Sequence, residues 1–378
     1  MKIGFLADIN QHHVRRWLPY FLKNHDVTLI NHREIIAPGC QKFFNKFNDN
    51  LNFDCYNVEL RKKSFISYFR FFKSIKNIIK KNEIEILYVH GLGIAGFLAS
   101  FVNKIKFVIK PYGSDILIFA QNNFLFRQIS KKIFKRADLI INTASNINNK
   151  CIELGGNSDK IHMIPMGTDL SIFHPNISAD HLRHQYNIQN STRVILSARH
   201  ISPLYNTDII IKSIPLVLKK IKNIKYIIPV GTFGGDKDYL KKINKLINNL
   251  DLRGYVELPQ SLEVEDMPAF HNLADIAISI PSSDSFPSFL HEAMACKVAS
   301  IVSDLPAVTE FLKNKINSYV IPVRNVNALA TATIELLSDQ SKIDRFTNYN
   351  YALVKEIADS KKNVQEVELL FKNLMQIV

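Results

Sequence analysis

Residues 279–304 read S-I-P-S-S-D-S-F-P-S-F-L-H-E-A-M-A-C-K-V-A-S-I-V-S-D, and this stretch decides the fold. A polar loop leads to Pro287, whose fixed φ suits the first turn of a helix, and Ser285 stands upstream in the position of an N-cap. We therefore expect a helix that begins near Phe286 or Pro287. Its apolar residues recur at three- and four-residue spacing, which predicts a buried stripe: Leu290, Ala293 and Met294.

The start of this helix has the features of an anion site. A helix N-terminus presents unpaired N–H groups and about half a positive charge, so the amides of residues 285–289 would suit a phosphate. Asp284 stands just ahead of them. Ser288, Glu292 and Ala295 share a smaller, more polar face that can look out at a ligand. The alternative is an ordinary strand, loop and amphipathic helix with acids on its surface.

Both halves of the chain repeat the order strand, helix, strand. This order is typical of doubly wound α/β domains, in which ligands bind outside the carboxyl ends of the strands. In the first half we expect the strand 1–7, the helix 14–24 and the strand 26–31, and in the second half 193–198, 208–219 and 224–230. The loop at 8–13 then faces the ligand of the first domain.

Length and composition describe a globular protein of two domains. The chain has 378 residues and is 47% hydrophobic, enough for two cores. We see no spanning segment and no signal peptide, so we expect a cytoplasmic protein. The four cysteines show no C-x-x-C spacing, which favours reduced structural thiols and argues against a metal site.

The net charge is +14, and part of it follows a pattern. Between residues 61 and 81, Lys and Arg interleave with Phe and Ile, as in a basic amphipathic helix that could rest on anionic lipid. The alternative is a core-packing helix with a solvated basic back. We expect no nucleic acid partner, because no nucleic-acid motif accompanies the charge.

Asp284, seven intervening residues and Glu292, between S-F-P and E-A-M-A, resemble the signature of the retaining GT-B glycosyltransferases of family four. The resemblance covers nearly the whole chain. It implies an α/β fold of two facing Rossmann-like domains with a deep interdomain cleft. Residues 1–172 would bind the acceptor and 173–363 the nucleotide-sugar donor, and a C-terminal helix at about 364–378 would cross back to the first domain.

The resemblance assigns roles on the donor side. Asp284 would approach the transferred sugar, Glu292 would accept hydrogen bonds from the ribose, and Arg199, in S-A-R-H-I-S-P-L-Y-N, would contact the diphosphate. Further donor-side candidates lie along the diphosphate and base or at strand ends: Ser285, Phe286, Pro287, Ser288, Phe289, Asn206 and Gly231. Three features depart from the family pattern. Asp284 replaces the usual Glu, no Lys follows Arg199 in its loop, and Lys297 stands at a usual Gly.

Two loops of the first domain resemble acceptor or sugar contacts. In D-I-N-Q-H-H-V-R-R-W, His13 and Arg16 would touch the acceptor or a phosphate. In K-P-Y-G-S-D, Tyr112 stands where many members have a His, so a His role does not carry over and Tyr112 would close the sugar pocket by stacking. Gly113 would let the backbone approach the ligand. Asp115 completes this set.

We therefore expect a metal-independent, retaining glycosyltransferase without a cofactor. It would use a nucleoside-diphosphate sugar and a glycan or lipid-linked acceptor in cell-surface polysaccharide or lipopolysaccharide biosynthesis. It would sit in the cytoplasm, with peripheral contact to the inner face of the membrane as an option. The alternatives are a GT-B nucleotide-sugar epimerase, for which Asp115 is the obvious acid/base candidate, and a catalytically degenerate sugar-nucleotide-binding protein.

Overall fold

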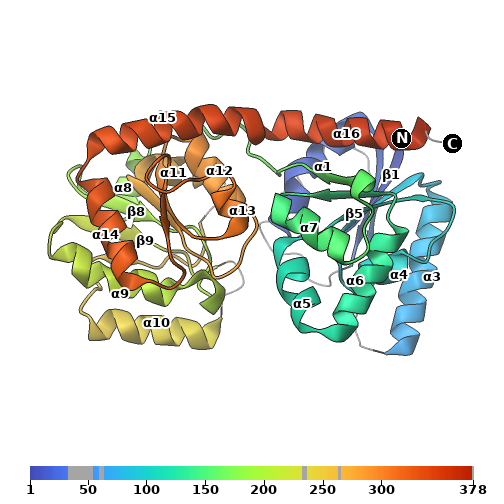
Figure 1. The fold of residues 1–378 in the computed structure, drawn as a ribbon, viewed down its shortest axis with the longest axis horizontal. Helices are drawn as coiled ribbons and strands as arrows, with labels where there is room; N and C mark the ends of the chain where they lie inside the picture. Colours follow the sequence, from blue (N-terminus) through green and yellow to red (C-terminus); the bar gives the residue numbers. More distant parts are fainter. Residues whose placement is uncertain (33–53, 59–63, 232–235, 263–264, 377–378) are drawn as a thin grey trace. The chain divides into compact units, whose positions relative to one another are not determined.

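A computed structural model gives the fold of the chain (Figure 1). It describes all residues except 33–53, 59–63, 232–235, 263–264 and 377–378, and the side chains of residues 12 and 13 also lie outside the described part. The chain divides into two compact units. Unit 1 comprises residues 1–166 and 360–378, and unit 2 comprises residues 167–359.

Unit 1 is built on a seven-stranded parallel sheet in the order β3-β2-β1-β4-β5-β6-β7. Its central strands are buried on both faces, which explains why they read as nearly continuous apolar runs. The strands are β1 (Lys2–Ala7), β2 (Asp26–Asn31), β3 (Asp54–Asn57), β4 (Ile86–His90), β5 (Lys106–Lys110), β6 (Leu139–Asn142) and β7 (Ile161–Met163).

The helices of unit 1 pack on this sheet, and the last helix of the chain is one of them. On α16, the Phe371 ring lies 5.6 Å from that of Phe21 on α1 and 5.2 Å from that of Tyr88 on β4. The C-terminal helix therefore completes the core of unit 1. The helices are α1 (His12–Asn24), α3 (Phe65–Lys81), α4 (Ile94–Ala99), the π-helical turn η1 (Asp115–Phe119), α5 (Ala120–Asn122), α6 (Phe124–Arg136), α7 (Ser145–Glu153), the 3₁₀ turn η2 (Ser158–Lys160) and α16 (Ser360–Gln376).

Unit 2 contains a six-stranded parallel sheet in the order β10-β9-β8-β11-β12-β13. Two parallel-sheet, Rossmann-like units confirm the predicted α/β class. The strands are β8 (Arg193–Leu196), β9 (Ile224–Ile227), β10 (Val256–Glu257), β11 (Ile276–Ser279), β12 (Ala299–Ser303) and β13 (Tyr319–Ile321).

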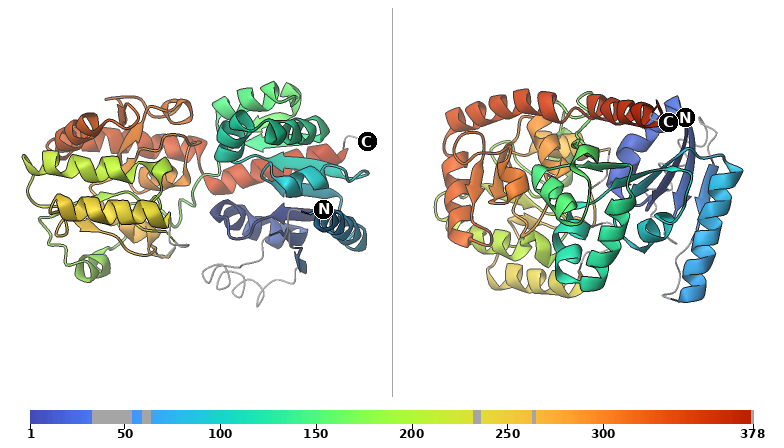
Figure 2. Two further views of the ribbon diagram at one scale, coloured as in Figure 1. Left: turned by 90° about the horizontal axis from the view of Figure 1, so that it is seen from below. Right: turned by 45° about the vertical axis from the view of Figure 1, so that its right-hand side comes forward.

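Two helical layers cover the two faces of this sheet. Residues of α9, α10 and α14 share one hydrophobic core, and residues of α8, α11, α12 and α15 share the other. Figure 2 shows α9 and α10 side by side. The helices are α8 (Asp180–Gln185), the 3₁₀ turn η3 (Pro203–Tyr205), α9 (Thr207–Leu218), α10 (Lys237–Asn249), α11 (Met267–Leu273), α12 (Ser288–Ala295), α13 (Pro306–Thr309), α14 (Val326–Leu337) and α15 (Gln340–Ile357).

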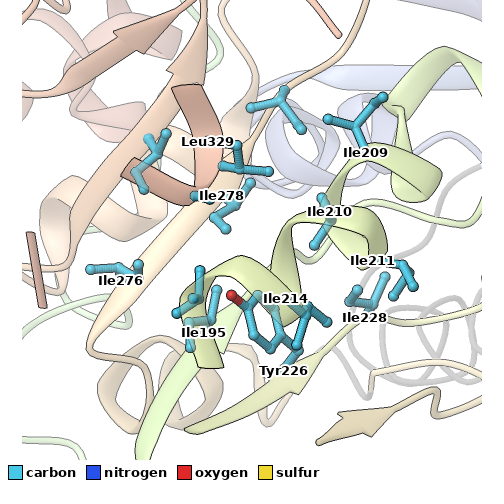
Figure 3. Packing of buried hydrophobic residues seen from close by; sticks show 14 of the residues in the cluster. Ile195, Ile209, Ile210, Ile211, Ile214, Tyr226, Ile228, Ile276, Ile278 and Leu329 are labelled. Carbon is cyan, nitrogen blue, oxygen red and sulfur yellow. The ribbon is translucent and has the colours of Figure 1, made fainter. Parts of the chain in front are cut away.

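The strands alternate between these two cores. Ile276 and Ile278 of β11 belong to the core under α9, whereas Ala277 between them belongs to the core under α12. Figure 3 shows Ile276 and Ile278 in this core, with Ile278 near Leu329 of α14. The alternation fixes the register of β11, because a slip of one residue would exchange its two faces.

The helix α12 differs from the sequence-based expectation in its start and its burial. It begins at Ser288 with Pro287 as its N-cap, so Ser285 is not the cap and no side chain caps this end. The small polar face of α12 is also less exposed than an amphipathic surface helix would make it, because every residue of α12 is buried. The physical reason is that α11, α15 and the strands β11 and β12 all contact this short helix, so that no face is left to solvent.

Lys297, which stands at a usual Gly, adopts a left-handed conformation after the end of α12. Lys297 has a φ of 57°, which costs a non-glycine residue on the order of 1 kcal/mol. Its N–H donates to the carbonyl of Met294 (3.2 Å), and the N–H of Val298 donates to that of Ala293 (2.8 Å). This is the Schellman pattern, which turns the chain sharply into β12.

Candidate functional site

The candidate site lies where the strand order of unit 2 reverses. From β8 the chain continues to β9 on one side, whereas β11, the other neighbour of β8, leads on to β12 in the opposite direction. Ligands of open α/β sheets bind at such points, outside the carboxyl ends of the strands. Arg199 lies in the loop after β8, and Asp284 lies in the loop after β11.

A salt bridge joins these two loops. Nη2 of Arg199 lies 2.7 Å from Oδ2 of Asp284, and the two side chains are only 18% and 15% exposed. Burial raises the pKa of Asp284, while the Arg199 charge and the N–H of Ser285, which donates to Oδ1 (2.9 Å), oppose that shift. The Arg199 guanidinium also lies 4.3 Å from the ring of Tyr205. The pair is thus held in place from three directions.

Glu292 lies within electrostatic reach of this pair. Burial lowers the pKa of Arg199, but the charges of Asp284 and, more weakly, Glu292 help to raise it overall. Oε2 of Glu292 lies 3.4 Å from Nε2 of His271, a fully buried residue of α11. His271 therefore positions the Glu292 carboxylate from behind. The structure brings Arg199, Asp284 and Glu292 together, as the sequence-based hypothesis requires.

Asn206 links the loops that carry Arg199 and Asp284. It is completely buried and adopts a left-handed conformation (φ 54°), which Asn tolerates better than most residues. Its Nδ2 donates to the carbonyl of Ile280 (2.8 Å) and to Oγ of Ser282 (3.0 Å). The structure therefore gives Asn206 a positioning role.

The aromatic side chains just before and within α12 are buried in the core. Phe286 and Phe289 belong to the core under α12, and the Phe286 ring stacks on Phe311 at 4.9 Å. Their side chains are therefore part of the core, and a place along a diphosphate and base stays a prediction for these residues. Pro287 and Ser288 are also buried.

Gly231 closes one edge of the site. It has a φ of 119°, which a side chain would strain, and its N–H donates to the carbonyl of Gln260 (2.9 Å). The neighbouring carbonyl of Val230 accepts from the N–H of Ile201 (3.0 Å). The bond of Val230 attaches the segment after β9 to the loop that carries Arg199, and the bond of Gly231 attaches it to the segment after β10.

A second polar cluster lies at the carboxyl edge of the unit 1 sheet. Oδ2 of Asp115 accepts hydrogen bonds from the N–H groups of Leu92 and Tyr112, both at 3.0 Å. Burial raises the pKa of Asp115 to about 7, although these backbone groups oppose the shift. Burial, and then the charges of Asp115 and Asp8, raise the pKa of Tyr112. The Tyr112 ring lies 6.3 Å from that of His90.

The remaining predicted residues of unit 1 lie nearby in the chain or on α1. Gly113 is half-buried in the same turn as Tyr112 and Asp115. Arg16 is half-buried on α1. His13 lies in the first turn of α1, and its side chain lies outside the described part of the structure. Within the described ranges, no cluster of three or more His, Cys, Asp or Glu side chains could hold a metal ion.

Sequence reasoning missed His271 and Lys110. His271 stands in no motif, and only the fold places it behind Glu292. Lys110, the last residue of β5, is 1% exposed, and its Nζ lies 4.2 Å from the centre of the Trp17 ring. That amine has no hydrogen-bond partner within the described residues. In the sequence, only the position of Lys110 at the end of an apolar strand distinguishes it from the other lysines.

Two protein-family models match the chain, one within unit 1 and one within unit 2. The family model "Glycosyl transferase 4-like" matches residues 2–144, and "Glycosyl transferases group 1" matches residues 178–353. The N-acetyl-alpha-D-glucosaminyl L-malate synthase of Bacillus anthracis is 20% identical over 351 residues, which is 90% of this chain and 89% of that protein.

Two solved structures show the same fold. The Anabaena protein HepE in complex with UDP and glucose has a TM-score of 0.84 at 16% identity, with 99% of this chain and 100% of that chain covered. A glycosyltransferase from Rickettsia africae has a TM-score of 0.83 at 15% identity, with 100% and 99% covered.

The two matched domains and their fold define a glycosyltransferase. The chain belongs to glycosyltransferase family four and has the GT-B fold, which confirms the resemblance seen in the sequence.

Lys110 predicts a pH dependence of stability. Burial lowers its pKa to about 7 in the folded state, whereas an unfolded lysine titrates near 10.4. Between these values the unfolded state binds more protons, so stability rises with pH. We expect Lys110→Met to raise the free energy of unfolding by about 2 kcal/mol at pH 7 and by less at pH 10. Urea unfolding at both pH values measures this.

The exposed Lys73 provides the matched control, because Lys73→Met should leave the pH dependence as it is in the wild type. If Lys110→Met has the same dependence of stability on pH as the wild type, the amine of Lys110 is not the buried titrating group.

Proposed function

We propose that the chain is a retaining glycosyltransferase that moves a sugar from a nucleoside-diphosphate sugar to a glycan or lipid-linked acceptor. The Arg199–Asp284 salt bridge at the strand-order reversal of unit 2 is the observation that carries the proposal. The HepE protein of the same fold, in complex with UDP and glucose, supports a nucleotide-sugar donor. The pathway we propose is cell-surface polysaccharide or lipopolysaccharide biosynthesis.

The proposed chemistry depends on where charge develops. Negative charge grows on the departing nucleoside diphosphate, and fixed positive groups stabilise it in a site that excludes water. Arg199 has five N–H donors, and only one nitrogen bonds Asp284, so further donors can reach a phosphate. Backbone amides at the start of α12 add to the positive potential that Arg199 supplies. Glu292 would hold the ribose, and Asp284 would orient the transferred sugar.

We place the acceptor at the polar cluster of unit 1. Tyr112, Asp115 and Asp8 supply an aromatic ring and carboxylates at the carboxyl edge of the sheet, where ligands of such domains bind. The Bacillus relative is named for an L-malate product, which supports a polar, hydroxyl-bearing acceptor. We further propose that the transfer needs no metal ion, since Arg199 can supply the charge that a metal would otherwise provide.

Asp115 is the observation that would favour the epimerase alternative. Its pKa of about 7 suits a general acid or base, but both backbone bonds to Oδ2 fix it as part of a turn. The degenerate binding protein would bind a nucleotide sugar without turnover. Incubation with a panel of UDP-, GDP-, ADP- and dTDP-sugars separates the three hypotheses. A glycosyltransferase would transfer or hydrolyse the sugar, an epimerase would yield an epimerised donor, and a binding protein would bind the donor without turnover.

Arg199→Ala provides the sharper test of the mechanism. Loss of a charge-assisted contact to the developing diphosphate should raise the barrier by roughly 2–4 kcal/mol, about thirtyfold to a thousandfold in rate. Donor hydrolysis measured with the best sugar nucleotide of the panel gives the rate. Arg199→Lys should recover part of it, since the charge remains.

A matched control removes a similar ion pair at the other end of the same strand. Arg193, the first residue of β8, pairs with Asp275, so Arg193→Ala should affect stability and leave the rate within about threefold. Wild-type turnover by Arg199→Ala would remove Arg199 from the mechanism.

We also propose peripheral contact between α3 and an anionic membrane surface. Phe65 and Phe69 are 85% and 60% exposed, and Lys73, Lys76 and Lys80 continue the same line at three- and four-residue spacing. The opposite face buries Phe71, Ile75 and Ile78. The line therefore offers two aromatic rings and three cations to lipid. No helix within the described part of the chain is long and apolar enough to span a membrane.

Vesicle binding tests this surface. Each basic residue near an anionic surface contributes on the order of 1 kcal/mol, so changing Lys73, Lys76 and Lys80 to Glu should cut sedimentation with anionic vesicles at least tenfold. Binding should also fall as salt rises. The control changes the exposed Lys219, Lys220 and Lys222 to Glu, an equal change in net charge on unit 2. Equal loss in both variants, or no wild-type binding, would contradict the proposed surface.

A further inference from the structure

A third loop reaches the donor side of unit 2. It follows β13 and carries Arg324, whose φ of 61° is unusual for a residue with a side chain. Glycine would adopt this conformation without the penalty of about 1 kcal/mol. An arginine held in this conformation suggests that its side chain has a use that offsets the strain.

The guanidinium of Arg324 is anchored beside the site. Nη1 donates to Oδ1 of Asn206 (2.6 Å), and Nη2 donates to Oδ2 of Asp208 (3.0 Å). Asn206 is the buried residue that also bonds Ser282, two positions before Asp284. One buried side chain therefore connects Arg324 to the loops that carry Arg199 and Asp284.

The charge of Arg324 is not needed to neutralise Asp208. Oδ2 of Asp208 already has Lys212 at 3.1 Å, and Oδ1 accepts from the hydroxyl of Tyr239 at 2.7 Å. Burial raises the pKa of Asp208, but these partners together with Arg324 lower it overall. Asp208 would remain ionised and paired without Arg324. The guanidinium of Arg324 is therefore available for a second role besides its bond to Asp208.

The site needs a second cation. The charge of Arg199 is shared with Asp284, and the following loop, residues 200–206, contains no Lys or Arg. A nucleoside diphosphate carries at least two negative charges, which one paired arginine cannot balance in a partly buried site. Arg324 has five N–H donors, two of its nitrogens are engaged, and its side chain is 49% exposed. The remaining donors can reach a ligand.

We infer that Arg324 is the second diphosphate-binding cation of this enzyme, and that Asn206 and Asp208 hold its guanidinium toward the donor. The inference rests on the proposed function and names a residue that the sequence motifs did not. It also explains the composition of the loop after Arg199, in which Tyr205 and Asn206 support two arginines and supply no charge of their own.

Calorimetric titration with UDP, GDP, ADP and dTDP tests the inference, with the nucleotide that the wild type binds most tightly used throughout. Arg324→Ala should weaken its binding at least tenfold, and Arg324→Lys should weaken it by less because the charge remains. Hydrolysis of the matching sugar nucleotide should slow in the same order.

A merely structural role is excluded by a second variant. If Arg324 served only to neutralise Asp208, removal of Lys212, the other cation on Oδ2 of Asp208, would reproduce the loss of affinity. We expect Lys212→Ala to bind the nucleotide within about threefold of the wild type, since Arg324 keeps its bonds to Asn206 and Asp208. Thermal unfolding of each variant reports whether it is folded.

The outcomes separate the two claims. If the wild type binds a nucleoside diphosphate and Arg199→Ala weakens it, but folded Arg324→Ala binds as the wild type does, the inference alone is overturned. Equal losses in Arg324→Ala and Lys212→Ala also overturn it. If the wild type binds none of the four nucleotides, or Arg199→Ala binds normally, the proposed function fails and takes the inference with it.

Discussion

The salt bridge between Arg199 and Asp284 is the contact on which the candidate site depends. It joins the loops that follow the two strands at which the order of the unit 2 sheet reverses. Because both partners are largely buried, each needs the other: an unpaired charge at this depth would be costly. Asn206 links the same two loops, and the bond between Ile201 and Val230 holds the Arg199 loop from its other side.

Much of the fold followed from patterns along the sequence. Apolar runs predicted the buried strands, and the repeat of strand, helix and strand predicted two Rossmann-like units, because parallel sheets covered on both faces require such runs. The spacing of Asp284 and Glu292 placed both acids near one helix start. Motif spacing succeeds here because a short loop that leads directly into a helix has few ways to arrange two residues eight positions apart.

The rest of the site depends on contacts between distant segments. Sequence alone suggested a polar side for α12, but it did not show that α11 and α15 enclose the helix or that Glu292 contacts His271 of another element. Arg324 lies 118 positions from Asn206 in the sequence, so no local sequence pattern predicts their hydrogen bond. In the sequence, Lys110 is only the last residue of an apolar strand. The contact of its amine with the Trp17 ring depends on the fold. Such pairings are set by packing, which periodicity does not encode.

The central claim is that the donor nucleotide binds in unit 2 at Arg199, Asp284 and Glu292. The most direct measurement is the calorimetric affinity of Glu292→Gln for the nucleotide that the wild type binds best, compared with that of Glu366→Gln, a change on the exposed side of α16. Loss of a charged hydrogen-bond partner predicts about tenfold weaker binding for Glu292→Gln, with thermal unfolding showing a folded protein and Glu366→Gln unchanged. Wild-type affinity in folded Glu292→Gln would contradict the account.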